Sequence, residues 1–355
     1  MDRFVETVIH EIQLRASSST LRPPSSIFFG GGTPSLLQPQ QLKRILAEIP
    51  GADVAVEVTM ECNPGTVTVE KLQGYRAAGV NRLSFGVQSF VQEELDFLTR
   101  IHSADESREA MTLAREAGFN NVNMDLMFAL PPQTLESLKF SIDALLQLEP
   151  DHISAYSLTY EQGTPLYAQK VKGLVKPHEE EYDADMYAMV IDLLSAAGYS
   201  QYEVSNFARE AKQCQHNLVY WHGEDYMAVG PSAHGLIRGR RYWNHRSLTA
   251  WTEKVDAGEL PEANSEIIDS QRRLTELAFL TIRADGMPID QFKRELNVDL
   301  LTALKPDIDY WIEAGMVVVR GDRICLTAKG YQVCDEITIK VEALLDAHSF
   351  SDHGA

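Results

Sequence analysis

The chain contains few cysteines, and they are widely spaced. No two of the four are closer than nine positions; they are Cys62, Cys214, Cys325 and Cys334. Iron–sulfur clusters and structural zinc sites are held by closely spaced cysteines, so the sequence predicts neither kind of site within these residues. Because the cysteines are dispersed and no secretory signal peptide is recognisable, we expect reduced thiols and a cytoplasmic protein.

The sequence also lacks a long apolar segment and an excess of positive charge. No apolar run approaches the roughly 20 residues that a membrane-spanning helix requires. The formal net charge of −19 disfavours nucleic acid or an anionic membrane surface as the main partner. We therefore predict no nucleic-acid partner and at most a transient association with membranes.

Short apolar segments alternate with helical segments over the first half of the chain. This alternation predicts an α/β protein with a parallel sheet and crossover helices, and strand spacings of roughly 25–35 residues fit the βα units of a barrel or partial barrel. The predicted strands are 27–29, 54–60, 82–87, 121–127 and 152–158, and the predicted helices between them are 38–48, 67–78, 91–97, 104–117 and 134–147.

The chain opens on a helix, although a βα barrel should begin with a strand. Residues 3–15 carry apolar side chains on one stripe, which is typical of an amphipathic helix. The strand 27–29 would then present a bare edge, which natural sheets usually cover. The pattern predicts a partial barrel that is missing its first strand. Truncation at the N-terminus and degeneration of this part of the fold are the two explanations.

The second half of the chain predicts two further regions. A polar helix spans 178–197, and the segments 315–319 and 324–330 are typical of the hairpin of a small winged-helix-like α+β domain. Residues 266–355 contain 16 Asp and Glu against 10 Lys and Arg, which disfavours DNA binding by that domain. The predicted domains are a partial barrel over 1–175, a connecting region over 176–265 and the C-terminal domain over 266–355.

Polar residues follow several of the predicted strands. Parallel barrels place ligand sites at the carboxyl ends of their strands, where such residues would meet. Consecutive glycines after strand 27–29 let backbone amides approach a ligand, but the spacing is neither a P-loop nor a Rossmann fingerprint. Each residue taken singly could equally be a helix cap or a satisfied polar group. Together Glu61, Gln88 and Asp125 predict a hydrogen-bonding pocket, with Arg100 in the segment that follows Gln88, whereas the glycine run taken alone could be a tight turn.

A second candidate site lies in the segment Cys214-Gln215-His216-Asn217-Leu218-Val219-Tyr220-Trp221. An imidazole beside an amide, a phenol and an indole suits a flat apolar ligand that needs an axial nitrogen donor. By itself the segment could also consist of ordinary core or surface residues. Cys214 could be a second ligand or an inert thiol, and His234 could face the same pocket or be structural.

Taken together, these motifs resemble the HemW family of heme chaperones, which are relatives of the oxygen-independent coproporphyrinogen III oxidases in the radical S-adenosylmethionine (SAM) superfamily. The runs GGGTP, ExNPG, GVQSF, RxH and NxDLM occur in the family order over residues 27–134, and QYEVSNFA and HNxxYW follow. The resemblance implies a radical-SAM-type barrel with a HemN-like C-terminal domain. It also implies that Gly31, Gly32, Thr33, Glu61, Gln88, Arg100 and Asp125 bind SAM, and that His216, as iron ligand, binds heme with Tyr220 and Trp221.

The cluster motif of this superfamily is not present in the sequence. Radical-SAM enzymes hold a [4Fe-4S] cluster on a C-x3-C-x2-C loop after the first barrel strand, so the resemblance implies a cluster only in a form extended upstream. Two functions remain: a heme chaperone that delivers heme to acceptors such as respiratory proteins, or a radical-SAM oxidative decarboxylase of coproporphyrinogen III. The HNxxYW run favours the chaperone, and no catalytic residue is assigned.

Overall fold

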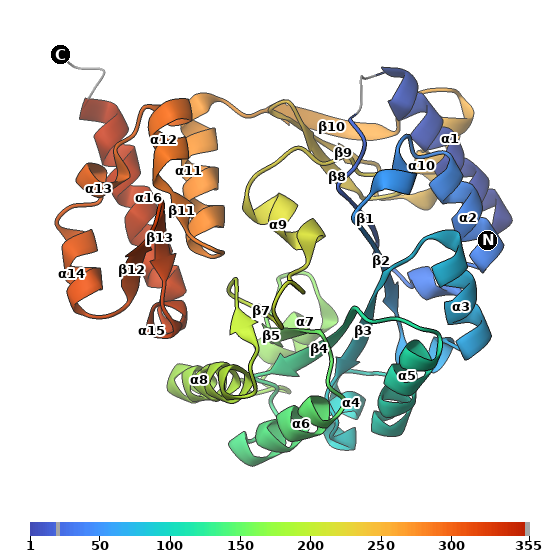
Figure 1. Cartoon of the computed structure of the whole chain (residues 1–355), viewed down its shortest axis with the longest axis horizontal. Coiled ribbons are helices and arrows are strands. Elements are labelled where there is room, and N and C mark those ends of the chain that lie inside the picture. Colours follow the sequence, from blue (N-terminus) through green and yellow to red (C-terminus); the bar gives the residue numbers. More distant parts are fainter. Residues whose placement is uncertain (19–21, 352–355) are drawn as a thin grey trace. The chain divides into compact units, whose positions relative to one another are not determined.

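A computed structural model describes residues 1–18 and 22–351 and divides the chain into two compact units (Figure 1). The sheet unit comprises Ser26–Lys43 and Val56–Cys214. The composite unit combines Met1–Ser25, Arg44–Ala55 and Gln215–Ala355. The three predicted domains, with limits at 175/176 and 265/266, stay a prediction.

The sheet unit is built on a seven-stranded sheet in the order β1-β2-β3-β4-β5-β7-β6, in which the first five strands are parallel. All five predicted strands are present, but the second begins later than predicted because Ala52–Val54 form a 3-10 turn. The antiparallel strands β6 and β7 were not predicted, since such short strands give no periodic signal. The strands are β1 (Ser26–Phe29), β2 (Glu57–Cys62), β3 (Arg82–Gln88), β4 (Val122–Phe128), β5 (His152–Ser157), β6 (Ser200–Gln201) and β7 (Asn206–Ala208).

Helices alternate with the parallel strands, as the sequence predicts. Ser103 caps the N-terminus of α5 and forms a capping box with Glu106, and Thr134 caps α6, which explains where both helices start. Glu179 precedes α8, and Glu180 and Glu181 lie in its first turn, where the helix dipole favours negative charge. The helices are α2 (Pro39–Ala47), α3 (Val69–Ala78), α4 (Gln92–Phe97), α5 (Ala104–Glu116), α6 (Leu135–Gln147), α7 (Pro165–Val171) and α8 (Glu180–Ala196), with 3-10 turns at Pro34–Leu36 and Pro64–Thr66.

The two faces of this sheet differ in chemistry, because alternate residues of a strand point to opposite faces. One set of alternating residues is apolar and buried, and burial of each large side chain stabilises the fold by roughly 1.5–3 kcal/mol. This set includes Met60, Leu83, Phe85, Val122, Met124 and Ile153. Helix α5 contacts β3, and helix α8 contacts β4 and β5. The other set, called the polar face here, consists of Glu57, Thr59, Glu61, Arg82, Ser84, Asn123, Asp125, His152, Ser154 and Tyr156.

The composite unit begins with α1 (Asp2–Ser18), which confirms the predicted N-terminal helix. A three-stranded antiparallel sheet that the sequence did not predict begins within the glycine-rich passage at 229–235. Its elements are β8 (His234–Ile237), β9 (Arg240–Asn244) and β10 (Glu262–Ile267), with α9 (Gln215–Trp221) before them and α10 (Leu248–Asp256) between β9 and β10.

A buried carboxylate joins α1 to that sheet. Glu11 is fully buried, and its Oε1 accepts hydrogen bonds from Arg15 Nε at 2.8 Å and Asn244 Nδ2 at 2.8 Å. Its Oε2 accepts from the backbone N–H of Gly230 at 2.9 Å and from Trp251 Nε1 at 2.7 Å. The helix therefore packs through a buried ion pair as well as through its predicted apolar stripe.

The C-terminal part of the composite unit has the predicted hairpin. Strands β12 and β13 are antiparallel, and β11 pairs with β13 to complete a small sheet of the winged-helix type. None of the helices described has the length and apolar character needed to cross a bilayer. The elements are α11 (Ser270–Ile282), β11 (Met287–Pro288), α12 (Ile289–Leu296), α13 (Leu300–Ala303), α14 (Asp307–Glu313), β12 (Val317–Arg320), β13 (Arg323–Leu326), α15 (Ala328–Gln332) and α16 (Cys334–Ser351).

Candidate functional site

The glycine run after β1 is exposed and open. Gly31 and Gly32 have φ angles of +76° and +62°, which residues with a side chain rarely adopt. A Cβ atom added to either glycine would meet nothing within 4 Å, so the space beside this backbone is free. The N–H of Gly31 donates to Glu61 Oε2 at 3.1 Å. Thr33 is exposed at the end of the same run. A ligand can therefore approach this backbone closely.

Two carboxyl groups of the polar face influence one another. Burial raises the pKa of Glu61, the hydrogen bond from Gly31 lowers it, and the charge of Asp125 raises it again. Burial also raises the pKa of Asp125, while hydrogen bonds from Asn123 and Ser154 and the positive charges of Arg82 and Arg100 lower it. A cationic group bound beside these carboxylates would offset their repulsion. The pair is therefore suited to a ligand that carries an ammonium or a sulfonium.

Gln88 ends β3 in a strained conformation. Its φ angle is +69°, and its side chain is buried on the sheet. A Cβ atom at Gly86 would lie 3.0 Å from Gln88 Nε2, so the GVQSF run uses its glycine to make room for this amide. Left-handed backbone at a residue other than glycine is tolerated mainly where the surroundings or a function require it. The conformation supports a binding role for Gln88.

Arg100 and His102 of the RxH run have different roles. Partial loss of hydration lowers the pKa of the Arg100 guanidinium, and the negative charge of Asp125 acts in the opposite direction. Arg100 is therefore electrostatically coupled to the candidate site. His102 is buried, and its Nε2 hydrogen-bonds to the carbonyl of Val87 at 3.1 Å. It anchors the loop that carries Arg100.

Helix α9 carries the HNxxYW residues in the composite unit. His216 and Tyr220 lie one turn apart on one side of the helix, with His216 Nε2 and the Tyr220 hydroxyl 3.1 Å apart and the rings edge to face. None of the residues of α9 is fully buried, and Tyr220 is 40% exposed. Trp221 lies about 140° further round the helix than His216. The structure thus brings two of the three predicted heme-binding side chains together.

The other predicted ligands of this region are less suited to a metal. Cys214 is buried, and its thiol donates to Glu57 Oε1 at 3.4 Å. Cys62 is buried as well, and this burial raises the pKa of its thiol, which disfavours the thiolate. His234 is exposed on β8 and stacks on Trp243. Among the residues that the structure describes, no group of three His, Cys, Asp or Glu side chains could hold a metal ion, so these residues do not fit a four-iron cluster.

A carboxyl that the sequence did not single out lies in the QYEVSNFA run. Glu203 is fully buried, and its Oε2 accepts from the backbone N–H of Ser205 at 3.0 Å. Burial raises its pKa from 4.5 to about 7. Its charge contributes to raising the pKa of Tyr156 on the polar face. The QYEVSNFA motif drew attention to this segment, but a sequence motif does not show whether the Glu203 side chain is buried.

This pKa predicts a pH-dependent stability. The folded protein binds the Glu203 proton more tightly than the unfolded chain does, so stability decreases as pH rises from 4.5 to about 7. Glu203→Gln removes this decrease, and we expect the variant to be more stable than the parent by up to about 3 kcal/mol at about pH 8 and equal to it at about pH 4. Urea unfolding of both proteins across this range measures the difference; a difference that does not change with pH would contradict the assignment.

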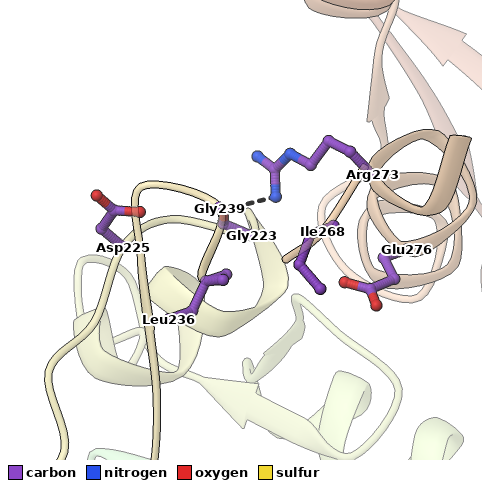
Figure 2. A pocket seen from close by; sticks show the side chains of 7 residues that line it. All are labelled: Gly223, Asp225, Leu236, Gly239, Ile268, Arg273 and Glu276. Atoms are coloured by element: carbon purple, nitrogen blue, oxygen red, sulfur yellow. Dashed lines mark hydrogen bonds between the residues drawn. The ribbon is translucent and has the colours of Figure 1, made fainter. Parts of the chain in front are cut away.

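A pocket of the composite unit lies beside α11 (Figure 2). Arg273 reaches over it and donates from Nη1 to the carbonyl of Gly223 at 2.8 Å. Glu276, also in its wall, is paired with Arg241. The charged groups of this wall therefore have protein partners, and the pocket contains none of the residues predicted to bind a ligand.

Comparison with known proteins gives two family matches. The profile of the radical SAM superfamily matches residues 13–145, and the profile of the HemN C-terminal domain matches residues 268–333. Curated relatives match nearly the whole chain. The heme chaperone HemW of Lactococcus lactis is 32% identical over 99% of this chain and 91% of its own length. That of Bacillus subtilis is 34% identical (95% and 90%), and that of Haemophilus influenzae is 41% identical (92% and 85%).

The fold is similar to that of a solved structure, the coproporphyrinogen III oxidase HemN of Escherichia coli. The TM-score is 0.78 over 98% of this chain and 83% of that one. At 22% sequence identity the likeness concerns the fold alone. It confirms the predicted radical-SAM-type α/β fold with a C-terminal domain.

Proposed function

Because the chain belongs to the HemW family of heme chaperones, within the radical SAM superfamily, we propose that it binds heme and passes it to acceptor proteins. The observation that carries this proposal is the accessible pair of His216 and Tyr220 on α9, a helix that has no fully buried residue. An imidazole nitrogen is a common axial ligand of heme iron, and the neighbouring aromatic side chains suit a flat macrocycle.

His216 would change partners when heme binds. Its Nε2 is hydrogen-bonded to the Tyr220 hydroxyl, and coordination of iron through that nitrogen replaces this bond. The phenol is partly exposed and can then bond to water. Heme held by one accessible helix can be released to an acceptor without opening a core, as a chaperone requires. We propose Trp221, on the flank of the same helix, as a further contact to the macrocycle.

We propose that SAM binds at the carboxyl ends of β1 to β4. The open backbone of Gly31 and Gly32 admits the amino-acid end of the ligand, and Glu61 and Asp125 receive its positive charge. The remaining contacts come from Thr33, Gln88 and Arg100. Bound to a four-iron cluster, SAM is a source of a carbon radical. The described residues do not fit such a cluster, so the role proposed for this chain is SAM binding alone.

The partners are proposed to be heme-accepting proteins, among them respiratory ones. The net charge of −19 supports neither nucleic acid nor a stably bound anionic membrane as a partner. Because the four cysteines are free thiols, we place the protein in a reducing compartment such as the cytoplasm. The alternative function is oxidative decarboxylation of coproporphyrinogen III. It is supported by the fold that the chain shares with HemN, whereas the family relationship favours the chaperone.

The test is to titrate the purified protein with hemin and then add excess apomyoglobin as a heme acceptor. We expect one hemin to bind per chain and to pass to apomyoglobin within minutes. Absorbance spectra monitor both steps. In parallel, anaerobic incubation with coproporphyrinogen III, SAM and dithionite should give no decarboxylated product. Stoichiometric hemin binding supports the chaperone, whereas turnover of the porphyrinogen or failure to bind hemin contradicts it.

A further inference from the structure

The polar face contains a buried amide that holds the Asp125 side chain. Asn123, two residues earlier on β4, donates from Nδ2 to Asp125 Oδ1 at 2.7 Å and to Ser84 Oγ at 2.8 Å. Both N–H groups of the amide are therefore engaged. Its oxygen points the other way and lies 2.6 Å from His152 Nδ1. The orientation of this amide is thus fixed by its contact with the carboxylate.

This orientation determines the protonation of His152. Because the Asn123 oxygen can only accept, His152 Nδ1 must carry a proton. The other ring nitrogen, Nε2, then accepts from the Tyr202 hydroxyl at 2.7 Å. The Tyr202 oxygen in turn accepts from the backbone N–H of Cys214 at 3.2 Å. Four hydrogen bonds run in one direction, from Cys214 through Tyr202, His152 and Asn123 to Asp125; we call this series the Tyr202 chain.

Burial supports the same protonation state. His152 is fully buried, and Asn123 and Tyr202 are buried beside it. Burial and the positive charge of Arg82 lower the pKa of His152 well below its usual value, so the ring is neutral. A neutral ring with its proton on Nδ1 satisfies both of its neighbours. Burying polar groups costs free energy that an apolar core would not require. A fully hydrogen-bonded series of this kind does, however, fix the orientation of the group at its end, which here is the Asp125 carboxylate.

We propose that Tyr202 and His152 are positioning residues that hold the Asp125 carboxylate in the orientation in which it binds the positively charged part of SAM. The proposal rests on the proposed function in taking Asp125 as part of the SAM site. It gives the QYEVSNFA run, which contains Tyr202, a specific role. The Tyr202 chain also joins this carboxylate to Cys214, two positions before His216 in the sequence.

The test compares Tyr202→Phe with a matched control, Tyr199→Phe. Tyr199 is also buried, and its hydroxyl donates to the carbonyl of Pro150 at 2.6 Å and accepts from Arg209 Nε at 3.3 Å, outside the Tyr202 chain. Both variants lose one buried hydroxyl from the same part of the sheet unit. In calorimetric titrations with SAM, we expect Tyr202→Phe to weaken binding about 3- to 10-fold and Tyr199→Phe to leave it within about twofold.

A double variant separates positioning from a general loss of structure. If Tyr202 acts through Asp125, Tyr202→Phe combined with Asp125→Asn should bind SAM no more weakly than Asp125→Asn alone. Additive losses overturn the proposal, and so does unchanged SAM binding by Tyr202→Phe. If the parent protein itself binds no SAM, the SAM part of the proposed function fails, and the positioning role fails with it.

A second measurement needs no ligand. Nitrogen-15 spectra of the imidazoles should show His152 as the neutral Nδ1–H tautomer in the parent protein and in Tyr199→Phe. In Tyr202→Phe the Nε2 signal should shift, because that nitrogen loses its donor. A neutral Nε2–H tautomer or an imidazolium at His152 in the parent would overturn the Tyr202 chain, whether or not SAM binds. The spectra and the titrations therefore fail separately.

Discussion

Replacement of His216 by alanine should weaken hemin binding by at least about 10-fold and remove the absorption features of a histidine-ligated heme. The imidazole is the proposed iron ligand, and loss of an axial nitrogen removes a coordinate bond for which solvent is a poor substitute. The measurement is a hemin titration followed in the Soret region. Because α9 has no fully buried residue, the change should have little effect on folding.

Two neighbouring side chains serve as controls for this experiment. His222 follows α9 directly and hydrogen-bonds to Asp285 at 3.0 Å, so His222→Ala should leave hemin binding unchanged. Tyr220→Phe removes the hydroxyl that bonds to His216 and should retain the histidine-ligated spectrum. A normal spectrum in His216→Ala would refute the assignment and make His234 the next donor to test.

Replacement of Glu11 by alanine should lower the free energy of unfolding by about 3–5 kcal/mol. The carboxylate is fully buried and accepts four hydrogen bonds, one of them from Arg15. Removing one partner of a buried ion pair leaves the other charge poorly compensated and strands the remaining donors. Arg15 keeps a contact to Glu262 at 3.2 Å, so a value near the lower end is expected. Urea unfolding measures the loss.

The matched control lies on the same helix. Glu6 pairs with Arg44 at 2.6 Å, but both side chains are about half exposed. Glu6→Ala should therefore cost about 0–1 kcal/mol, because water screens the pair and solvates the arginine that remains. If the two alanine variants unfold at the same urea concentration, the buried network does not stabilise the composite unit in the way its geometry implies.

Local patterns made much of the sheet unit predictable. Alternation of apolar strands and helical segments depends on residues a few positions apart, and it placed all five parallel strands and the helices between them. Gly31, Glu61 and Gln88 lie at or just beyond the carboxyl ends of strands, so a parallel sheet carries them to one edge whatever the rest of the chain does. The resemblance to the HemW family came from the same short runs, and the comparisons confirm it.

Buried polar contacts could not be predicted in the same way. Glu11 and Arg15 are charged residues of the predicted amphipathic helix, yet both are buried, and apart from each other their partners are 219 to 247 positions away in the sequence. Glu203 likewise reads as an ordinary acid in a polar run. Whether a charged side chain meets water or a buried donor depends on which distant segment covers it, and no local periodicity contains that information.

The sequence by itself therefore determined the family, the positions of the parallel strands along the chain and the residue types at their ends. The tertiary structure alone decided that Asn123, His152 and Tyr202 form one directed series of hydrogen bonds ending at Asp125. Strand register places these side chains on a common face, and burial removes the water that would otherwise satisfy them. Each polar group must then find a partner in the protein, and the fold supplies it.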